Sequence, residues 1–510
     1  MARTVLRGAL ALQGPRLTFA RRPVDVAIEH GRISAIEPAG AIAAADVVIE
    51  LPRHLLVPGL VNGHFHSHEH FQRGRLENLP LELWQHYVRP LAPVALTPRQ
   101  TYLRTLIGAI ECLRTGATCM VDDLALGGAV RRDAVDAVLQ AYDDVGVRAL
   151  VGFSMMDRPL IDTFPFADAL VPADLRERMR ALPRPAPQEY LDLVESLAAS
   201  RHPRTRRVGV AVAPSAPQRC TEDFLSACAR LADELDLPLL THVQETRLQV
   251  VTGIERYGTP IVEHLARIGF LGPRTTLIHA VWLNPREIRA LADAGATAQH
   301  NPWSNLTLGS GVQPVRALLD AGVNVSLGSD GSCSTVSVNM LNVVGTAAAV
   351  SKVRGDDYSA WLTAEEALVA GTQAGARALG FGAGLGVIAP GAIADLVAYR
   401  LDTVTFTPLN DPVRQLVYGE RGAGLDFVMV AGDVVVRDGR LARVDEPKLL
   451  AEIEAEFRAL EDRFAAAEAS VAPVRAVMEQ IYARALATGI PADTYPARLP
   501  SRAPGPDRLH

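Results

Sequence analysis

The chain has 510 residues, 48% of them hydrophobic and 21% charged, with a formal net charge of -6. This length exceeds one ordinary domain of about 100–200 residues, although α/β barrels run longer. The slight negative charge argues against a general binder of nucleic acid or of anionic membranes.

Cysteine usage and apolar runs bear on the compartment. The five cysteines form no C-x-x-C pair, which favours a reduced, cytoplasmic protein. The N-terminal residues are interrupted by Arg3, Arg7 and the stretch 13–16, so we expect no secretory signal. Uncharged apolar runs of about 20 residues do not occur, so we expect no membrane span.

Both ends of the chain predict short strands joined by tight turns. Residues 1–58 contain the runs 24–28 and 33–36, separated by a turn with Gly31. The same pattern of short strands and tight turns recurs in residues 380–445. Two β-rich blocks that flank a different middle predict one small β-sandwich domain built from both chain ends.

The middle, residues 59–379, alternates strand-like apolar runs with amphipathic helical segments. Eight such repeats predict a (β/α)8 TIM-like barrel within an α/β fold. A doubly wound sheet is the competitor, but no G-x-G-x-x-G follows an early strand. The candidate strands are 56–63, 117–122, 149–154, 208–213, 237–242, 276–279, 296–300 and 323–328.

Two segments lie outside this pattern. The proline-rich stretch 155–190 follows the third strand, so it emerges on the active-site face as a lid or as a plain surface excursion. Residues 446–510 predict a C-terminal helical extension and tail, for packing or for contacts between subunits.

Metal-type side chains fall at the ends of the candidate strands, where a barrel carries its chemistry. His64 and His66 stand two apart after the first strand, so both point the same way, as ligands do. His242 ends the fifth strand. Glu245 follows three residues later, where a carboxylate can serve as a proton shuttle, the alternative being an exposed loop glutamate.

Three further segments complete the set. His279 closes the sixth strand, Asp330 closes the eighth, and the stretch 300–305 begins with another histidine. Neutral imidazole and carboxylate oxygen suit a borderline divalent cation, and catalytic sites keep a position open for water. The sequence therefore predicts a metal-dependent hydrolase.

The chain resembles the amidohydrolase superfamily, in the branch containing cytosine deaminase, S-adenosylhomocysteine deaminase, guanine-type deaminases and the triazine hydrolases. The resemblance covers nearly the whole chain to about residue 445. It rests on the runs PGLVNGHFH (58–66), RG (73–74), HVQET (242–246), HNPWSN (300–305), GSDG (328–331) and GAIADL (391–396).

The resemblance implies one Zn²⁺, or else Fe²⁺, held by His64, His66, His242 and Asp330. It implies no carboxylated-lysine bridge, because the fourth strand contains no lysine. The cation would lower the pKa of its water, and Asp330 would accept a hydrogen bond from the resulting hydroxide. His279 would orient this nucleophile, and Glu245 would carry protons to the ring and to the leaving amine.

These roles predict hydrolytic deamination of an amino-substituted nitrogen heterocycle. The alternative keeps the site and changes the bond, as in hydrolysis of a urea, carbamate, amide or C–Cl group. A metal-bound scaffold without turnover is a third hypothesis, but a structural site would be coordinatively closed. We expect a small-molecule substrate and a homodimer or higher homo-oligomer.

Substrate specificity depends on residues that depart from the family pattern. Ala92 and Ser215 stand where nucleoside deaminases of this kind carry a glutamate and a histidine, which disfavours a nucleoside. Glu69 either faces a substrate with N–H donors or positive charge, or pairs with Arg73 or Arg75. Two tryptophans are candidates to stack on a flat ring, although the one in segment 81–88 also fits rim packing. The predicted substrate contacts are Glu69, His70, Trp84, Ser215, Gln218, Trp303 and Ser334.

Overall fold

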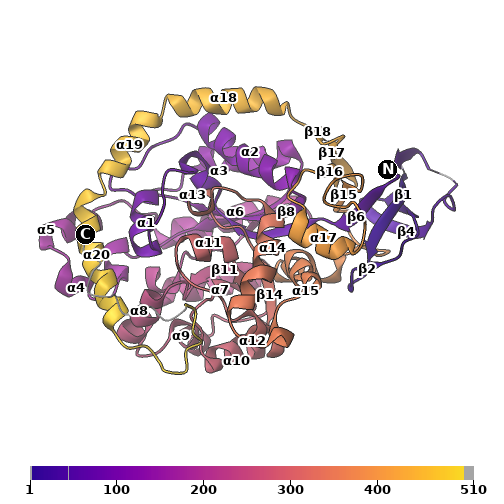
Figure 1. The fold of residues 1–510 in the computed structure, drawn as a ribbon. Helices are drawn as coiled ribbons and strands as arrows, with labels where there is room; N and C mark the ends of the chain where they lie inside the picture. The colour runs from indigo at the N-terminus through magenta and orange to yellow at the C-terminus, as the bar shows by residue number, and fades with distance from the viewer. Residues whose placement is uncertain (1–2, 44, 499–510) are drawn as a thin grey trace.

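The computed structural model describes residues 3–43 and 45–498. At one end of the molecule, strands from both chain ends form one sheet of order β18-β17-β16-β15-β6-β1-β3-β4, with β2 and β5 also paired to β1 (Figure 1). This confirms a small β-domain assembled from both ends. Its strands are β1 Thr4–Gln13, β2 Thr18–Phe19, β3 Val24–Glu29, β4 Arg32–Pro38, β5 Val47–Glu50, β6 His54–Pro58, β15 Leu396–Arg400, β16 Leu425–Val430, β17 Asp433–Arg437 and β18 Arg440–Leu441.

The middle of the chain forms parallel sheets in sequence order. In the described ranges, β7 to β10 make one four-stranded sheet and β11 to β14 another. A parallel bridge between Val212 and Leu239 joins them at one seam. At the other seam Asp330 N–H donates to His64 O (2.9 Å). This agrees with the predicted TIM-like barrel. The strands are β7 Leu60–Phe65, β8 Ala117–Ala125, β9 Arg148–Ser154, β10 Val208–Ala211, β11 Leu239–Val243, β12 Thr275–His279, β13 Thr297–His300 and β14 Asn324–Leu327.

Helices connect the parallel strands and begin at residues suited to capping. Thr97 and Asn284 each cap a helix in a reciprocal capping box. Within the described ranges, none of the helices is long and apolar enough to cross a bilayer. The longer connecting helices are α1 Leu81–Val88, α2 Pro98–Arg114, α3 Arg132–Val145, α6 Pro187–Arg201, α7 Glu222–Glu234, α8 Arg247–Tyr257, α9 Ile261–Arg267, α10 Pro285–Ala294 and α14 Met340–Val350. Helix α17 Pro412–Gly419 lies instead between the antiparallel strands β15 and β16. Shorter ones are η1 Ser67–Gln72, α11 Pro302–Thr307, α12 Val315–Asp320, α13 Ser332–Thr335, α15 Ala364–Val369 and α16 Gly375–Ala378.

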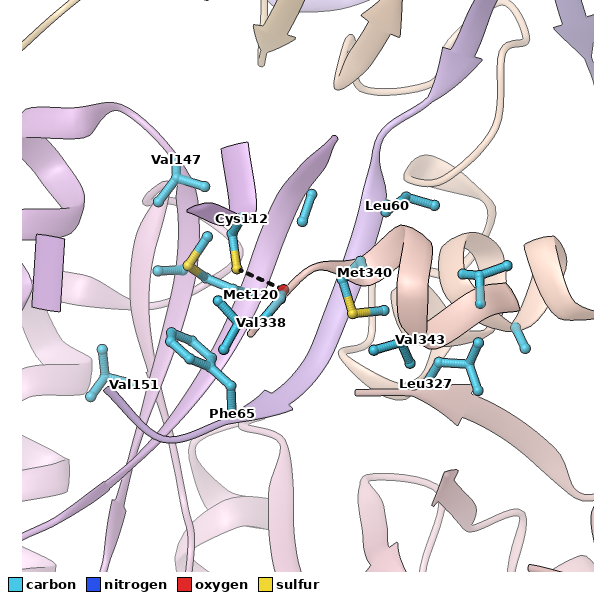
Figure 2. Packing of buried hydrophobic residues seen from close by; sticks show 14 of the residues in the cluster. Leu60, Phe65, Cys112, Met120, Val147, Val151, Leu327, Val338, Met340 and Val343 are labelled. Carbon is cyan, nitrogen blue, oxygen red and sulfur yellow. Dashed lines mark hydrogen bonds between the residues drawn. The ribbon is translucent and has the colours of Figure 1, made fainter. Parts of the chain in front are cut away.

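The barrel core lies where helices pack on the strand that carries the first histidines. Figure 2 shows Phe65 of β7 beside Met120 of β8, and Met340 of α14 near Leu60. The Cys112 thiol donates to Val338 O (3.8 Å), which ties α2 to the loop before α14. This packing holds the end of β7 rigidly, as a metal site requires.

The proline-rich stretch 155–190 folds into short helices rather than an open loop. These are η2 Leu160–Thr163, α4 Ala167–Leu170 and α5 Ala173–Arg180. Their apolar side chains, among them Ile161 and Met179, are buried against Met478 and Ile481 of α20 (Ala472–Ala487). The stretch is therefore packed in place by the C-terminal extension.

The C-terminal extension forms an arc around the outside of the barrel (Figure 1, yellow). It comprises α18 Glu446–Arg458, α19 Glu461–Ala469 and α20. Ion pairs fasten it along its length, including Arg99 to Glu452 (2.6 Å) and Arg75 to Glu468 (2.6 Å). The predicted packing role is thus visible, while the end of the predicted tail, residues 499–510, lies outside the described residues.

Candidate metal centre and active site

Histidines from separate strands converge at one end of the parallel sheets. The ring centroids of His64 and His66 lie 4.6 Å apart, and that of His242 lies 4.9 Å from His64 and 5.5 Å from His66. Asp330 Oδ1 lies 3.4 Å from His64 Nε2 and 3.3 Å from His66 Nε2. All four side chains are buried. The structure therefore brings together the four residues predicted to hold the metal.

The imidazoles are oriented to offer Nε2 lone pairs to a cation. His66 Nδ1 lies 2.7 Å from Asp123 O, and His242 Nδ1 lies 2.7 Å from Ser215 O. Because a carbonyl oxygen accepts, each Nδ1 carries the hydrogen and each Nε2 is left bare. Neither nitrogen of His64 has a hydrogen-bond partner among the described residues, although the side chain is fully buried. These orphaned nitrogens fit a divalent metal.

The protonation states also fit a metal. Burial lowers the pKa of His66 to about 3 and that of His242 well below its usual value, so both rings are neutral near pH 7. Burial opposes ionisation of Asp330, yet His64, His279 and His66 hold its pKa well below the usual value. A site of neutral imidazoles and one carboxylate has the donor chemistry of zinc or iron(II).

The backbone at the strand ends is held in a sparsely populated conformation. His279 has φ 71° and Asp330 has φ 64°, both left-handed for residues with a Cβ. Such conformations cost on the order of 1–3 kcal/mol each and concentrate at functional sites. Here they turn the two side chains toward the shared centre.

Asp123 is a further candidate ligand that the sequence analysis missed. It lies near the C-terminal end of β8, and its carboxylate belongs with His64, His66 and His242 to a group of ligand atoms within 4.8 Å of one another. Burial raises its pKa to about 8, so near pH 7 its neutral form predominates. The sequence signal that could have revealed Asp123 is its place near the end of the second barrel strand.

Glu245 and His279 form an acid–base pair beside the metal ligands. Glu245 Oε2 lies 3.5 Å from His279 Nε2, and its other oxygen lies 3.3 Å from Ser310 Oγ. Glu245 is only 3% exposed, so the alternative of an exposed loop glutamate is wrong. Burial, with Asp330 and Glu82 nearby, raises the pKa of Glu245 to about 7, as suits a proton shuttle.

The last residue of the segment 300–305, rather than its first, contacts the candidate active site. Asn305 Oδ1 accepts a hydrogen bond from His279 Nδ1 (2.9 Å). His300, in contrast, lines a different cavity with Gln313 and Arg354. The run HNPWSN thus marks a residue that orients His279, not another metal ligand.

Glu69 lies against the loop that carries Asp330. Its Oε2 accepts from Cys333 N–H (3.3 Å), and burial raises its pKa well above the usual value. A methyl group on Gly331 would lie 1.7 Å from the same oxygen, so a side chain there would have to displace the Glu69 carboxyl group. Arg73 and Arg75 pair elsewhere, with Glu111 and Glu468, so the alternative pairing with Glu69 is wrong.

Two other predicted substrate contacts lie on the same side as the metal ligands. Ser215 lines a cavity of about 420 Å³ next to them, and its Oγ accepts from Arg219 (3.2 Å). Ser334 lies on the Asp330 loop and donates to Gly331 O (2.9 Å). Both hydroxyls already take part in a hydrogen bond. Of the two residues, only Ser215 lines the cavity.

The remaining predicted contacts do not line this cavity. His70 is buried against Gly108, where an added methyl would lie 1.9 Å from its ring. Trp84 is buried with Leu308, as the rim-packing alternative expects. Gln218 lines a separate small cavity, and Trp303 is 39% exposed with its indole N–H donated to Thr335 O (3.2 Å). Neither tryptophan lines the cavity of about 420 Å³, and stacking on a substrate ring stays a prediction.

Comparisons with known proteins all indicate the same family. The family model described as the Amidohydrolase family matches residues 55–435. A 5'-deoxyadenosine deaminase from Methanothermobacter thermautotrophicus is 35% identical over 450 residues, covering 88% of this chain and 97% of that protein. A 5-methylthioadenosine/S-adenosylhomocysteine deaminase from Pyrococcus furiosus is 33% identical over 449 residues, covering 88% and 98%.

Solved structures agree with this relationship. A zinc-bound adenosine deaminase from Xanthomonas campestris has a TM-score of 0.80 at 29% identity, covering 91% of this chain and 98% of that chain. A zinc complex of atrazine chlorohydrolase from Arthrobacter aurescens also has a TM-score of 0.80, at 25% identity, covering 89% and 100%.

Proposed function

The chain belongs to the amidohydrolase family, and from that premise we propose that it is a metal-dependent aminohydrolase acting on an amino-substituted nitrogen heterocycle. One observation carries the proposal: a buried glutamate and histidine, 3.5 Å apart, stand beside converging metal-type ligands. A structural metal site is coordinatively closed and has no use for such a pair. The non-catalytic scaffold is therefore the weakest alternative.

His64, His66, His242 and Asp330 would hold the metal, and zinc is favoured. Support comes from the donor set and from the zinc in the related structures; iron(II) accepts the same donors. A divalent cation bound there supplies Lewis acidity and lowers the pKa of water to near neutrality. Asp330, ionised near pH 7, supplies the negative charge that the imidazoles lack.

Glu245 moves protons in this proposal. With a pKa of about 7 it can take a proton from the attacking water and give it to a ring nitrogen. It can then take the second proton, from the hydroxyl group formed at the attacked carbon, and give it to the departing amine. Its backbone N–H donates to Gln249 Oε1 (2.8 Å), which fixes the loop. The carboxylate therefore works from a fixed position.

His279 positions the attacking water. Its Nδ1 donates to Asn305, and its Nε2 lies toward Glu245 and Asp330. From this position Nε2 can form a hydrogen bond with the attacking water and hold it against the attacked carbon.

The substrate class follows from the relatives, which by their names deaminate adenine-containing compounds. We therefore assign an amino-substituted heterocycle of the adenine type, with the sugar left open because of Ala92 and Ser215. Hydrolysis of a C–Cl bond is the second candidate function, favoured by the structural likeness to atrazine chlorohydrolase.

Ammonia release from purines, pyrimidines, pterins and triazines tests the proposal directly. We expect ammonia from at least one ring class with the zinc-loaded protein. Release of chloride or of a substituted amine instead would support the second candidate. Retained metal with no turnover on any compound would contradict both.

We also propose a cytoplasmic location and a homodimer or higher homo-oligomer. The five cysteines are all free and buried, which suits a reducing compartment. Light scattering coupled to size-exclusion chromatography would give the subunit count, and a monomer would contradict this part of the proposal.

A further inference from the structure

A second cavity, of about 300 Å³, lies away from the candidate active site. It shares no lining residue with the cavity of about 420 Å³, and none of the proposed metal ligands lines it. Its walls come from β13, α12, α14 and the segment 351–362 that follows α14. Gly355 and Asp357 of that segment are exposed, whereas His300 and Gln313 are buried. The cavity therefore leads from the surface to the outer side of the barrel, and its volume is enough for a small molecule.

The imidazole of His300 points into the space between the barrel and its helices. Successive side chains of a strand face opposite sides of the sheet. The preceding residue, Gln299, faces the barrel interior, because a methyl group added to Gly63 of β7 would lie 2.6 Å from its Oε1. His300 therefore faces the helices, where it lines the cavity together with Leu362.

Three polar atoms of His300 and Gln313 have no hydrogen-bond partner within residues 3–43 and 45–498. They are Nδ1 and Nε2 of His300, which is 1% exposed, and Oε1 of Gln313, which is fully buried. The orientation of the Gln313 amide is fixed, because its nitrogen donates to His279 O (2.7 Å). Buried polar atoms are usually paired, so these three atoms mark where a bound molecule would be held.

The charged side chains around the cavity are paired within the described part of the chain. The pairs are Arg316 with Glu366 (2.9 Å) and Asp320 (3.6 Å), Arg354 with the carbonyl oxygen of Val312, and Asp357 with the hydroxyl of Ser359 (2.6 Å). Burial, with the charge of Arg354 adding to it, lowers the pKa of His300 to about 3, so this ring is neutral near pH 7. The groups that remain unpaired are therefore neutral, which suits a neutral ligand.

We propose that this cavity is a second ligand site, which binds a neutral cyclic amide through His300 and Gln313. The side-chain oxygen of Gln313 can only accept, so the ligand must offer it a donor. A neutral imidazole carries one N–H, which can donate to a carbonyl oxygen of the ligand. A cyclic amide presents N–H and C=O side by side on one edge. The apolar walls, among them Val315 and Trp361, suit its ring.

The second site goes beyond the proposed function, because it lies outside the active site and needs no turnover. Cyclic amides have two sources. Hydrolytic deamination of an amino-substituted ring is one, since water replaces C–NH2 by C=O, a ring nitrogen gains the hydrogen, and ammonia leaves. Other heterocycles are the second source. In either case the ligand would contact the Gln313 amide that holds the backbone of His279.

Isothermal titration calorimetry of the zinc-loaded protein with 2-quinolone tests the site. This compound is a neutral bicyclic amide, and 1-methyl-2-quinolone is its matched control, because a methyl group replaces the N–H that Gln313 would accept. We expect saturable binding of 2-quinolone and binding of the methylated compound that is weaker by about ten-fold or more, the scale of one buried hydrogen bond. Equal affinity for the two compounds, or no measurable binding of 2-quinolone, would overturn the proposal.

Variants assign the binding to this cavity. His300→Phe keeps a ring and removes both nitrogens, and Ala347→Leu adds bulk to the wall formed by α14. Each should weaken 2-quinolone binding by about ten-fold or more, and Ala347→Leu decides if His300→Phe does not fold. Glu245→Gln, changed in the active site, and Arg132→Gln, changed on the exposed face of α3, should bind as the parent does. Parent-like affinity in the cavity variants, or loss of binding in Glu245→Gln alone, would overturn the second site.

Titration with the 6-oxopurine hypoxanthine distinguishes the two sources. Hypoxanthine binding that depends on His300 would identify products of purine deamination as ligands, and binding of 2-quinolone alone would identify other heterocycles; both results support the site. Calorimetry needs no turnover, so a protein that releases no ammonia can still show binding that depends on His300. Ammonia release without binding of any cyclic amide would overturn the second site and leave the deaminase proposal standing.

Discussion

His279 Nδ1 lies 2.9 Å from Asn305 Oδ1, and both side chains are buried. The amide oxygen can only accept, so the imidazole donates through Nδ1. The other ring nitrogen, Nε2, lies 3.5 Å from Glu245 Oε2 and 3.7 Å from Asp330 Oδ2. Asn305 thus fixes the tautomer and the direction of the residue between the proton shuttle and the metal ligand.

Replacing Asn305 with leucine should lower kcat about 10–100-fold, the range found when an outer partner of a site histidine is lost. KM and zinc content should change little, because Asn305 itself touches neither substrate nor metal in the proposed site. Asn305→Asp keeps an acceptor oxygen at the same place and should recover much of kcat. Equal losses in kcat for both variants would contradict a positioning role.

Glu245→Gln should retain the metal and lower turnover by about 10²-fold or more, because an amide cannot accept and return a proton. Steady-state kinetics and elemental analysis of the same preparation provide both measurements. Glu195→Gln, on the exposed face of α6, is the matched control and should behave as the parent protein. Near-normal activity of Glu245→Gln would remove this residue from the mechanism.

The pH dependence of kcat/KM should report the same group. Burial raises the pKa of Glu245 to about 7, and the carboxylate must be ionised to accept a proton from water. Below this pH the group is protonated, so the rate should fall about ten-fold per pH unit as the pH drops, and should level off above it. The residual activity of Glu245→Gln should lack this acid limb. An acid limb that survives in that variant would assign the titration to another group.

His64→Ala should lose zinc. His64 is fully buried, its two nitrogens have no other partner among the described residues, and its Nε2 lies 3.4 Å from Asp330 Oδ1. Its removal deletes one of four proposed ligands, so the remaining three should hold the metal less tightly. Elemental analysis should show zinc well below one per chain, with His202→Ala as a remote control. Full zinc content in His64→Ala would refute the proposed ligand set.

Sequence patterns alone predicted the parallel strands and their order, because each is a buried apolar run. The division of one strand-like run into two strands was less accessible. The run 56–63 reads as one strand, but the structure divides it at Gly59 into β6 of the small sheet and β7 of the barrel. A methyl group at Gly59 would lie 2.1 Å from Thr118 Oγ1, so this close approach depends on a contact distant in sequence.

Site residues were predictable where they follow strands and harder where helices bring them in. His64, His66 and Asp330 end strands whose spacing points them to one centre. Asn305 reaches His279 from α11, a contact that periodicity does not reveal. Similarly, the partner of Arg75 is Glu468, 393 residues away, so no local pattern could exclude its pairing with Glu69.

The GAIADL run at 391–396 carries a buried ion pair, and this explains a motif that has no part in the chemistry. Asp395 accepts two hydrogen bonds from Arg148 of β9 (3.0 and 3.1 Å) and one from Ala431 N–H (2.7 Å). Both charged side chains are buried, at 5% and 2% exposure for Arg148 and Asp395. Asp395 thereby joins the small β-domain to the barrel.

Asp395→Asn should destabilise the fold by about 3–5 kcal/mol, since it leaves the guanidinium of Arg148 buried without its counter-charge. Denaturant unfolding of the zinc-loaded protein measures this loss. The double variant Arg148→Met/Asp395→Leu removes both charges and should recover much of it, because an apolar pair of similar volume pays no desolvation penalty. Asp133→Asn, which breaks an exposed pair with Arg131, should change stability little. If Asp395→Asn were as mild as Asp133→Asn, the pair would not hold the two domains together, and the motif would need another explanation.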